Sequence, residues 1–322
     1  MPISDAIIVV IIVKAAATPA PFIFFFANAT MLFCFPPGSK LSDGSNIRQM
    51  PVNDWSKVSI ETEAASKIMK KDKGKYLTIE APFVTWEDEK EQELIAGVVA
   101  DYIKTLLTKE ERKSVLVVGL GNREVTPDAL GPQVVDNLCV NRHLVSGEER
   151  RNRISAVAPG VMAQTGIETA VLIKGVVEQT NPTAVIALDA LAARNIHRLN
   201  TTIQLSDAGI SPGSGVGNHR HALNSKSMGI PVVAIGIPTV VDAVTIVSDT
   251  MNRLADAINN DSFYGGYEML SDEERRMLVY ELFIPRWRDM FVTPKNVDET
   301  VKNMSTTLSK AICYALLGKE RL

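Results

Sequence analysis

The stretch SVLVVGLGNREVTPDALGP, residues 114–132, decides the fold. It begins with a short β-branched run, which is typical of a strand buried inside a parallel sheet. Gly119 and Gly121 follow the run, and glycines at this point let the backbone turn sharply and approach a ligand. A dinucleotide-binding loop would place a third glycine where Glu124 stands. The loop instead carries a carboxylate, Asp128, at the end of the expected strand.

Strands and helices alternate on both sides of this stretch. Further apolar runs predict strands at 57–62, 75–82, 154–160, 183–190, 200–207 and 230–239, with 200–207 expected to be exposed. Helical apolar spacing predicts helices at 86–107, 133–144, 166–180, 240–258 and 297–317. Strands that alternate with helices imply an α/β fold with a doubly wound, mostly parallel sheet. Ligands of such sheets bind beyond the carboxyl ends of the strands.

The composition excludes some classes of function. The 322 residues carry a formal net charge of -3, which gives no general electrostatic reason to bind nucleic acid or an anionic membrane. Cys34, Cys139 and Cys313 share no metal-like or paired spacing. Such an odd and sparse set argues against a disulfide framework and is typical of a reducing compartment such as the cytoplasm.

The first 50 residues differ from the rest of the chain. They contain strongly apolar runs within residues 6–35, but Lys14 and two prolines interrupt them, so no run reaches the about 18 residues of a spanning helix. A joint rich in Pro, Gly and Ser follows at 36–46. We expect residues 1–50 to lie outside the fold, with membrane association as the alternative, and residues 51–322 to form one α/β domain.

A second carboxylate, Asp189, comes directly after the apolar run of the strand expected at 183–190. Burying a charge is costly unless it is paired or used, so Asp189 is either a functional residue or the ion-pair partner of Arg194. Asp128 has its own structural alternative, because Pro-Asp pairs are common in turns. Two carboxylates can share a proton, one activating water while the other protonates the leaving group. They could equally hold a metal ion that lowers the pKa of water. Either route predicts a hydrolase with an acidic site.

The third candidate loop spans residues 206–221 and is rich in glycine. It could wrap a peptide or an anion, although it lacks the ending of a P-loop. His219 and His221 lie in it, which keeps a metal site open as an alternative to two solvated side chains. Asp242, in the sequence Thr-Val-Val-Asp that begins at Thr239, has the spacing of a capping box, and that structural role accounts for it.

At these residues the chain closely resembles the germination protease family, the spore proteases of endospore-forming bacteria. The segments that carry the resemblance, in family order, are GLGNREVTPDALGP, PGVMAQTGIET, IALDALAAR, QLSDAGISPGSGVGN, IPTVVDAVTIVSDT and MFVTPKNVD. The resemblance runs from about Val52 to the C-terminus. It implies that Asp128 and Asp189 are the catalytic aspartates, and it leaves an aspartic-type and a metal-dependent mechanism both open.

The resemblance also implies an endopeptidase that degrades small acid-soluble spore proteins in the spore core during germination. It implies a core similar to that of the hydrogenase-maturation proteases, a homotetramer, no certain cofactor, and a divalent metal as the open alternative. Family members are zymogens with a polar start and a self-cleaved propeptide, and residues 1–50 show neither feature. Two other functions compete: a hydrogenase-maturation-type metal-dependent protease, and a catalytically silent spore protein of the same fold. The presence of both aspartates argues against the second.

Overall fold

The computed structural model describes residues 9–13, 54–69, 71–80, 87–144, 152–211, 221–258, 270–282 and 290–319. The strands are β1 (Val9–Val13), β2 (Asp54–Ile60), β3 (Gly74–Glu80), β4 (Ser114–Gly119), β5 (Arg153–Val157), β6 (Ala184–Ala193), β7 (Thr202–Ser206), β8 (Val232–Asp242) and β9 (Phe291–Val292). The helices are α1 (Glu63–Met69), α2 (Glu89–Leu106), α3 (Leu130–Asp136), α4 (Met162–Thr165), α5 (Thr169–Thr180), α6 (Ser225–Met228), α7 (Ala243–Ile258), α9 (Asp272–Leu282) and α10 (Val297–Leu317). Two short 3-10 helices are η1 (Thr126–Asp128) and η2 (Ile196–Arg198).

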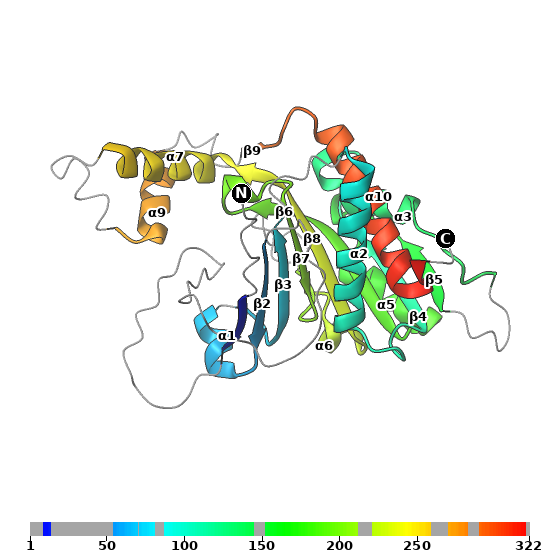
Figure 1. The fold of residues 1–322 in the computed structure, drawn as a ribbon. Coiled ribbons are helices and arrows are strands. Elements are labelled where there is room, and N and C mark those ends of the chain that lie inside the picture. The colour runs from blue at the N-terminus through cyan, green and yellow to red at the C-terminus, as the bar shows by residue number, and fades with distance from the viewer. Residues whose placement is uncertain are drawn as a thin grey trace, which may run out of the picture.

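One sheet runs through the described part of the chain, in the order β1-β2-β3-β7-β8-β6-β4-β5, with β9 beside β8 (Figure 1). The strands β5, β4, β6 and β8 pair in parallel. Successive residues of β4 enter two different cores: Val115 and Val117 pack toward α2, α3 and α10, whereas Leu116 and Val118 pack toward α5 and α6. Helices therefore cover both faces, and the prediction of a doubly wound α/β sheet is confirmed for this half.

The other half of the sheet is largely antiparallel. β7 pairs antiparallel with β8 and with β3, and β3 pairs antiparallel with β2. β7 was expected to be exposed, but most of its residues are buried because strands flank it on both sides. Periodicity alone cannot show which strand becomes central, since that depends on pairing with residues far away in the sequence.

The sheet also begins earlier than the sequence suggested. β1 pairs in parallel with β2, with Val9 opposite Ser56 and Val13 opposite Ile60. Its sequence, VVIIV, is entirely β-branched, which is typical of a strand. Residues 9–13 thus belong to the sheet, contrary to the expectation for that pentapeptide. The rest of residues 1–50 lies outside the described residues, so the domain boundary near residue 50 stays a prediction.

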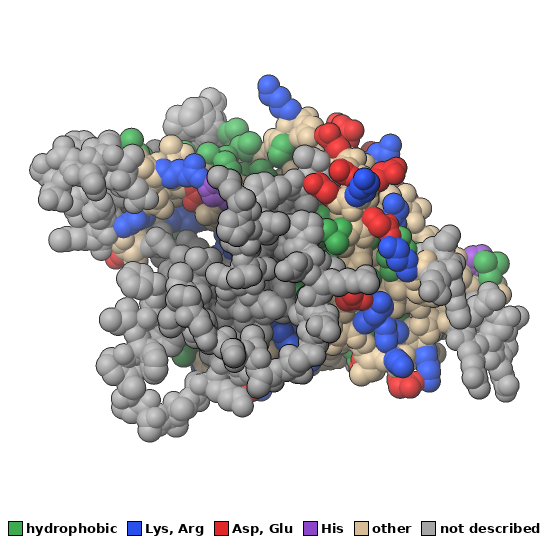
Figure 2. All heavy atoms as spheres, in the orientation of Figure 1, with side chains coloured by type: hydrophobic (Ala, Val, Ile, Leu, Met, Phe, Trp, Pro, Cys, Tyr) green, Lys and Arg blue, Asp and Glu red, His purple; other side chains and the backbone are tan. Residues whose placement is uncertain are grey.

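The main core lies between the sheet and two long helices, α2 and α10, which lie side by side in Figure 1. Ile95, Val99 and Ile103 of α2 are fully buried and recur every four residues, the spacing of one helix face. Leu308 and Ile312 do the same in α10. Burial of each such side chain contributes about 1.5–3 kcal/mol. On the opposite, solvent side of these helices, acidic and basic side chains are interspersed (Figure 2), in keeping with the small net charge.

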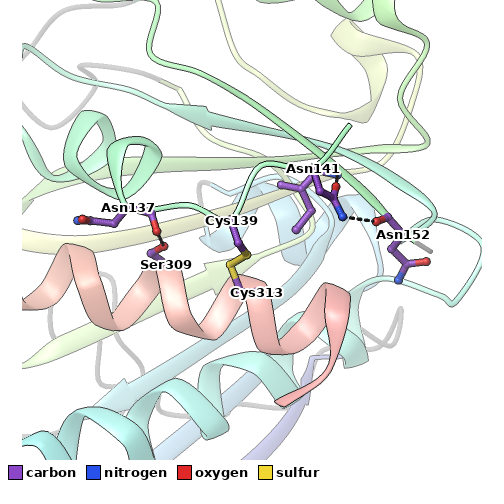
Figure 3. Close-up of a disulfide and its surroundings, with 7 residues drawn as sticks. Asn137, Cys139, Asn141, Asn152, Ser309 and Cys313 are labelled. Carbon is purple, nitrogen blue, oxygen red and sulfur yellow. Dashed lines mark hydrogen bonds between the residues drawn. A yellow bond between two sulfur atoms is a disulfide. The ribbon is translucent and has the colours of Figure 1, made fainter. Parts of the chain in front are cut away.

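Cys139 and Cys313 form a disulfide, so the prediction from cysteine spacing was wrong (Figure 3). Cys139 follows α3 and Cys313 lies in α10, 174 residues later, with 6.4 Å between the Cα atoms. Their spacing carries no signal because only the packing of α10 on α3 brings them together. Nearby, the Ser309 hydroxyl donates to the Asn137 carbonyl at 2.6 Å, a second tie between the same two elements.

Asp242 caps a helix, as the sequence predicted, but as the N-cap residue and not as the fourth residue of a capping box that begins at Thr239. Its Oδ1 accepts the backbone N–H of Thr245 at 2.7 Å, so Asp242 itself caps the start of α7. Its Oδ2 accepts from Arg276 of α9 at 2.7 Å, which ties α9 to α7. Thr239, the expected partner in a capping box, donates its hydroxyl to the Pro127 carbonyl instead.

Within the described residues, no helix is long and apolar enough to cross a membrane.

Candidate active site

Asp128 lies in η1, in the loop that leaves β4 at the carboxyl edge of the parallel strands. The loop first runs along β6, because the Leu120 N–H donates to the Leu188 carbonyl at 2.8 Å. Gly121 then closes the loop on Asp128 with a φ of +112°. A Cβ at this position would lie 1.9 Å from the Asp128 carbonyl oxygen. Only glycine fits at position 121, because the backbone there lies against the backbone of Asp128.

The half-buried Asp128 is held by its own loop and by a neighbouring strand. The backbone N–H of Asn122 donates to Asp128 Oδ2 at 2.6 Å, and the N–H of Asp128 donates to the Val125 carbonyl at 2.8 Å. From β8, the buried Thr239 hydroxyl donates to the Pro127 carbonyl at 2.6 Å. A hydrogen bond from an N–H to a carboxylate is among the stronger kinds, and it fixes the direction of the carboxylate.

Asp189 lies within β6 and is only 6% exposed. β6 continues as far as Ala193, so Asp189 does not end its own strand as the sequence suggested. The neighbouring β4, however, ends at Gly119, which pairs with Leu188. Asp189 is thus the first β6 residue beyond the end of β4, where the loop to Asp128 begins. The fold brings both predicted aspartates to the same edge of the sheet.

Arg194, the ion-pair partner considered for Asp189, is exposed, whereas Asp189 is buried. The positive charge of Arg194 also acts on Lys71. Burial, followed by the charges of Arg194 and Arg198, lowers the pKa of the Lys71 ammonium. The three cations mark a positively charged region that the sequence did not reveal, because Lys71 lies more than 120 positions before the two arginines.

Lys71 and Arg198 line a pocket of about 530 Å³, which opens on the face of the sheet that carries Asp189. Gly236, which pairs with Asp189 across the strands, lines the pocket. So does Leu191, two residues beyond Asp189 and therefore on the same face of β6. The row continues through Gln204 of β7 and Thr78 of β3. A row of pocket-lining positions thus leads across the sheet from Asp189.

The walls of the pocket combine charge with apolar surface. The Lys71 ammonium lies 4.9 Å from the centre of the Tyr76 ring, within the range of a cation–π interaction. Burial raises the pKa of Tyr76 to about 12. Arg198 forms an ion pair with Glu80 at 3.0 Å. A pocket of this size and mixture can take a peptide side chain.

The glycine-rich loop at residues 206–221 lies largely outside the described residues. His221 is described, but residues 212–220, which contain His219, are not. The backbone N–H of His221 donates to Glu168 at 2.7 Å, and its Nδ1 lies 2.5 Å from the same carboxylate. Among the side chains that the structure describes, no three of His, Cys, Asp or Glu gather as metal ligands would. The metal alternative therefore stays a prediction.

Comparison with known sequences bears on this site. Residues 43–261, which include both aspartates, match the sequence profile described as germination protease. The germination protease of Caldanaerobacter subterraneus subsp. tengcongensis is 46% identical over 272 residues, which is 81% of this chain and 84% of that protein. Those of Clostridium acetobutylicum and Bacillus cereus are 41% and 42% identical, each over at least 80% of this chain and 83% of the relative. The chain is therefore an endopeptidase, a hydrolase of peptide bonds. It belongs to the germination protease family.

Two solved structures resemble the fold loosely. A NiFe hydrogenase maturation protease, HycI, of Thermococcus kodakarensis has a TM-score of 0.34 and 13% identity, covering 66% of this chain and 98% of that one. A hydrogenase 2 maturation peptidase of a Thaumarchaeota archaeon has a TM-score of 0.22 and 19% identity, covering 45% of this chain and 98% of that one. These belong to the class whose core the sequence resemblance implied, but likeness at these scores carries no argument about substrate or metal.

Proposed function

We propose that this endopeptidase degrades small acid-soluble spore proteins in the spore core during germination, as a homotetramer, and that Asp128 and Asp189 are its catalytic residues. One observation carries the assignment of the two aspartates. Two strands separated in sequence deliver two carboxyl groups to one edge of the sheet, one half-buried and the other 6% exposed beside a pocket.

In the proposed reaction, a water oxygen attacks the carbonyl carbon of the scissile peptide bond. One carboxylate takes a proton from that water, and the other carboxyl group gives a proton to the nitrogen as the C–N bond breaks. The N–H of Asn122, at 2.6 Å from Asp128 Oδ2, favours a carboxylate there, which suits Asp128 to the role of base. Asp189 is then the proton donor to the leaving amine.

The pocket beside Asp189 is the proposed place for a substrate side chain next to the scissile bond. At Gly236 the space above β8 is filled by the Leu191 side chain, and the two residues together form one wall of the pocket. Lys71, Tyr76 and Gln204 supply the polar groups that would orient the bound side chain.

The test is cleavage of a purified small acid-soluble spore protein by the full chain, with and without exhaustive chelation. A proton-sharing pair needs no metal, so the rate should be unchanged by EDTA. Loss of activity with EDTA, restored by zinc or another divalent ion, would favour the metal-dependent alternative, and His221 would be the first ligand to replace by alanine. No cleavage of this substrate in either condition would contradict the proposed substrate.

A further inference from the structure

The turn that presents an N–H to Asp128 is braced from a second loop. Gln164 Nε2 donates to Asn122 Oδ1 at 2.8 Å, although the two residues are 42 positions apart. Gln164 lies in α4, in the connection that follows β5. Because β5 pairs in parallel with β4, both loops leave the sheet at the same edge. The brace therefore connects the loop after β5 to the loop that carries Asp128.

Asn122 links this brace to the carboxylate. Its side-chain Oδ1 also accepts the backbone N–H of Glu124 at 3.0 Å, which fixes the path of the turn. Its own backbone N–H donates to Asp128 Oδ2 at 2.6 Å. The side chain and the backbone N–H of Asn122 belong to the same turn, so their directions are linked. The hydrogen bond from Gln164 to the Asn122 side chain therefore also stabilises the direction of the Asn122 N–H.

Gln164 is itself held in place, although it is exposed. Its Oε1 accepts the backbone N–H of Val161 at 3.4 Å, the first turn of α4. Gly160 has a φ of +73°, and a Cβ there would lie 3.0 Å from Gln164 Oε1, so this glycine leaves space for the side chain. Two oriented contacts therefore fix the amide, one to its own helix and one to Asn122.

We infer that Gln164 is a positioning residue for peptide hydrolysis: its amide holds the Asn122 turn so that the Asn122 N–H stays on the Asp128 carboxylate. The inference rests on the proposed role of Asp128. Gln164 does not touch the reacting groups and acts only through Asn122. Small displacements of a reacting group lower the rate of the chemical step more than they alter binding of the rest of the substrate.

The test compares Gln164→Glu with Gln179→Glu in the full chain. Both replace an amide nitrogen by oxygen at almost constant size, but Gln179 lies on the exposed side of α5. With a small acid-soluble spore protein as substrate, kcat of Gln164→Glu should fall about 10-fold to 100-fold. Its KM should stay within about twofold and its Tm should match that of the control, since exposed positions contribute little to stability. Gln179→Glu should behave as wild type.

A double-mutant cycle with Asn122→Ala separates positioning from a general structural effect. Without the acceptor oxygen, the change Gln164→Glu should lower kcat by less than about twofold more, because the two residues act on one interaction. Fully additive losses, or wild-type kcat in Gln164→Glu, would overturn the inference. If Asp128→Asn is inactive while Gln164→Glu is fully active, the positioning role alone fails. If Asp128→Asn keeps wild-type kcat, the proposed role of Asp128 fails first, and the positioning role with it.

Discussion

Asp128 and Asp189 carry the proposed chemistry, and their amide variants separate that chemistry from folding. Asparagine is nearly isosteric with aspartate but can neither take nor give the required proton. Asp128→Asn and Asp189→Asn should therefore each lower kcat by at least about 10³-fold, and the double variant should be little worse than either single one. The measurements are turnover of the protein substrate and circular dichroism of each variant.

Asp101→Asn is the matched control for these variants. Asp101 lies on α2, its side chain is 75% exposed, and it pairs with Lys104 one turn away. Exposed pairs of this kind contribute about 0–1 kcal/mol, so the control should keep both turnover and stability. Full activity in either single variant of the proposed pair would remove that residue from the mechanism.

Lys71 gives the pocket a dependence on pH. Its pKa is lowered chiefly by burial and further by Arg194 and Arg198. Between that lowered pKa and the ordinary value of the unfolded chain, the folded protein binds fewer protons than the unfolded one, so stability rises with pH. Below this window the cost of the buried charge is fully present, and above it the cost is gone.

Lys71→Met keeps the length of the side chain without its charge. It should raise Tm by a few degrees at pH 7, and its advantage over wild type should shrink as the pH approaches 10. Thermal melts across this range check it, with Lys67→Met on the exposed face of α1 as the control. A difference between Lys71→Met and wild type that does not vary with pH would show that lost contacts, and not the charge, cause the effect.

Among the helices and strands, those governed by local pattern could be predicted and those governed by distant partners could not. α10 and β4 begin and end where apolar spacing placed them. α3 begins earlier than predicted, at Leu130, because Pro132 stands in its first turn, where its missing N–H has no helical partner to lose. It ends at Asp136, after which the Asn137 side chain donates to the Gln133 carbonyl.

The disulfide between Cys139 and Cys313 closes a loop of 174 residues across α3 and α10. A cross-link that closes a long loop restricts the unfolded chain most, so its loss should destabilise the protein. Cys139→Ser should lower the free energy of unfolding of the oxidised protein by about 2–5 kcal/mol. Chemical denaturation with and without dithiothreitol measures this loss.

Dithiothreitol should lower the stability of wild type to near that of Cys139→Ser and leave the variant unchanged. Cys34→Ser, at the third cysteine of the chain, should behave as wild type in both conditions. Equal stability of wild type with and without reductant would show that the bond between α3 and α10 does not stabilise the fold.

For the molecule as a whole, the sequence predicted two candidate catalytic aspartates but not the residues around them. Asp189 was singled out because it comes directly after an apolar run, and Asp128 by its loop after a strand and by the resemblance to the germination protease family. The pocket was missed because α1, β2, β3, β7 and β8 all line it, and only the pairing of distant strands assembles them. Gln164 lies in PGVMAQTGIET, one of the segments that resemble the family. Its contact with Asn122 could not be predicted, because it depends on the pairing of β4 with β5.

The N-terminal segment tests the proposed boundary of the domain at residue 51. A shortened chain that starts at Pro51 loses β1, but β2 keeps its antiparallel pairing with β3 from Asp54 to Ile60. We therefore expect it to fold and to keep its oligomeric state and activity. Loss of β1 and of its pairing with β2 should lower the free energy of unfolding without unfolding the protein.

A full-length chain with Gly and Ser at residues 9–13 separates the loss of this edge strand from the loss of the other 45 residues (50 − 5) of the segment. Both proteins should lose the same stability if the strand alone matters, and both should elute from size exclusion as wild type does. Higher turnover in the shortened chain alone would mean that the segment restricts access to the site. A shortened chain that unfolds or dissociates would place the N-terminal residues within the core, because removal of an edge strand alone leaves the pairing of β2 with β3 intact, and the boundary at residue 51 would be wrong.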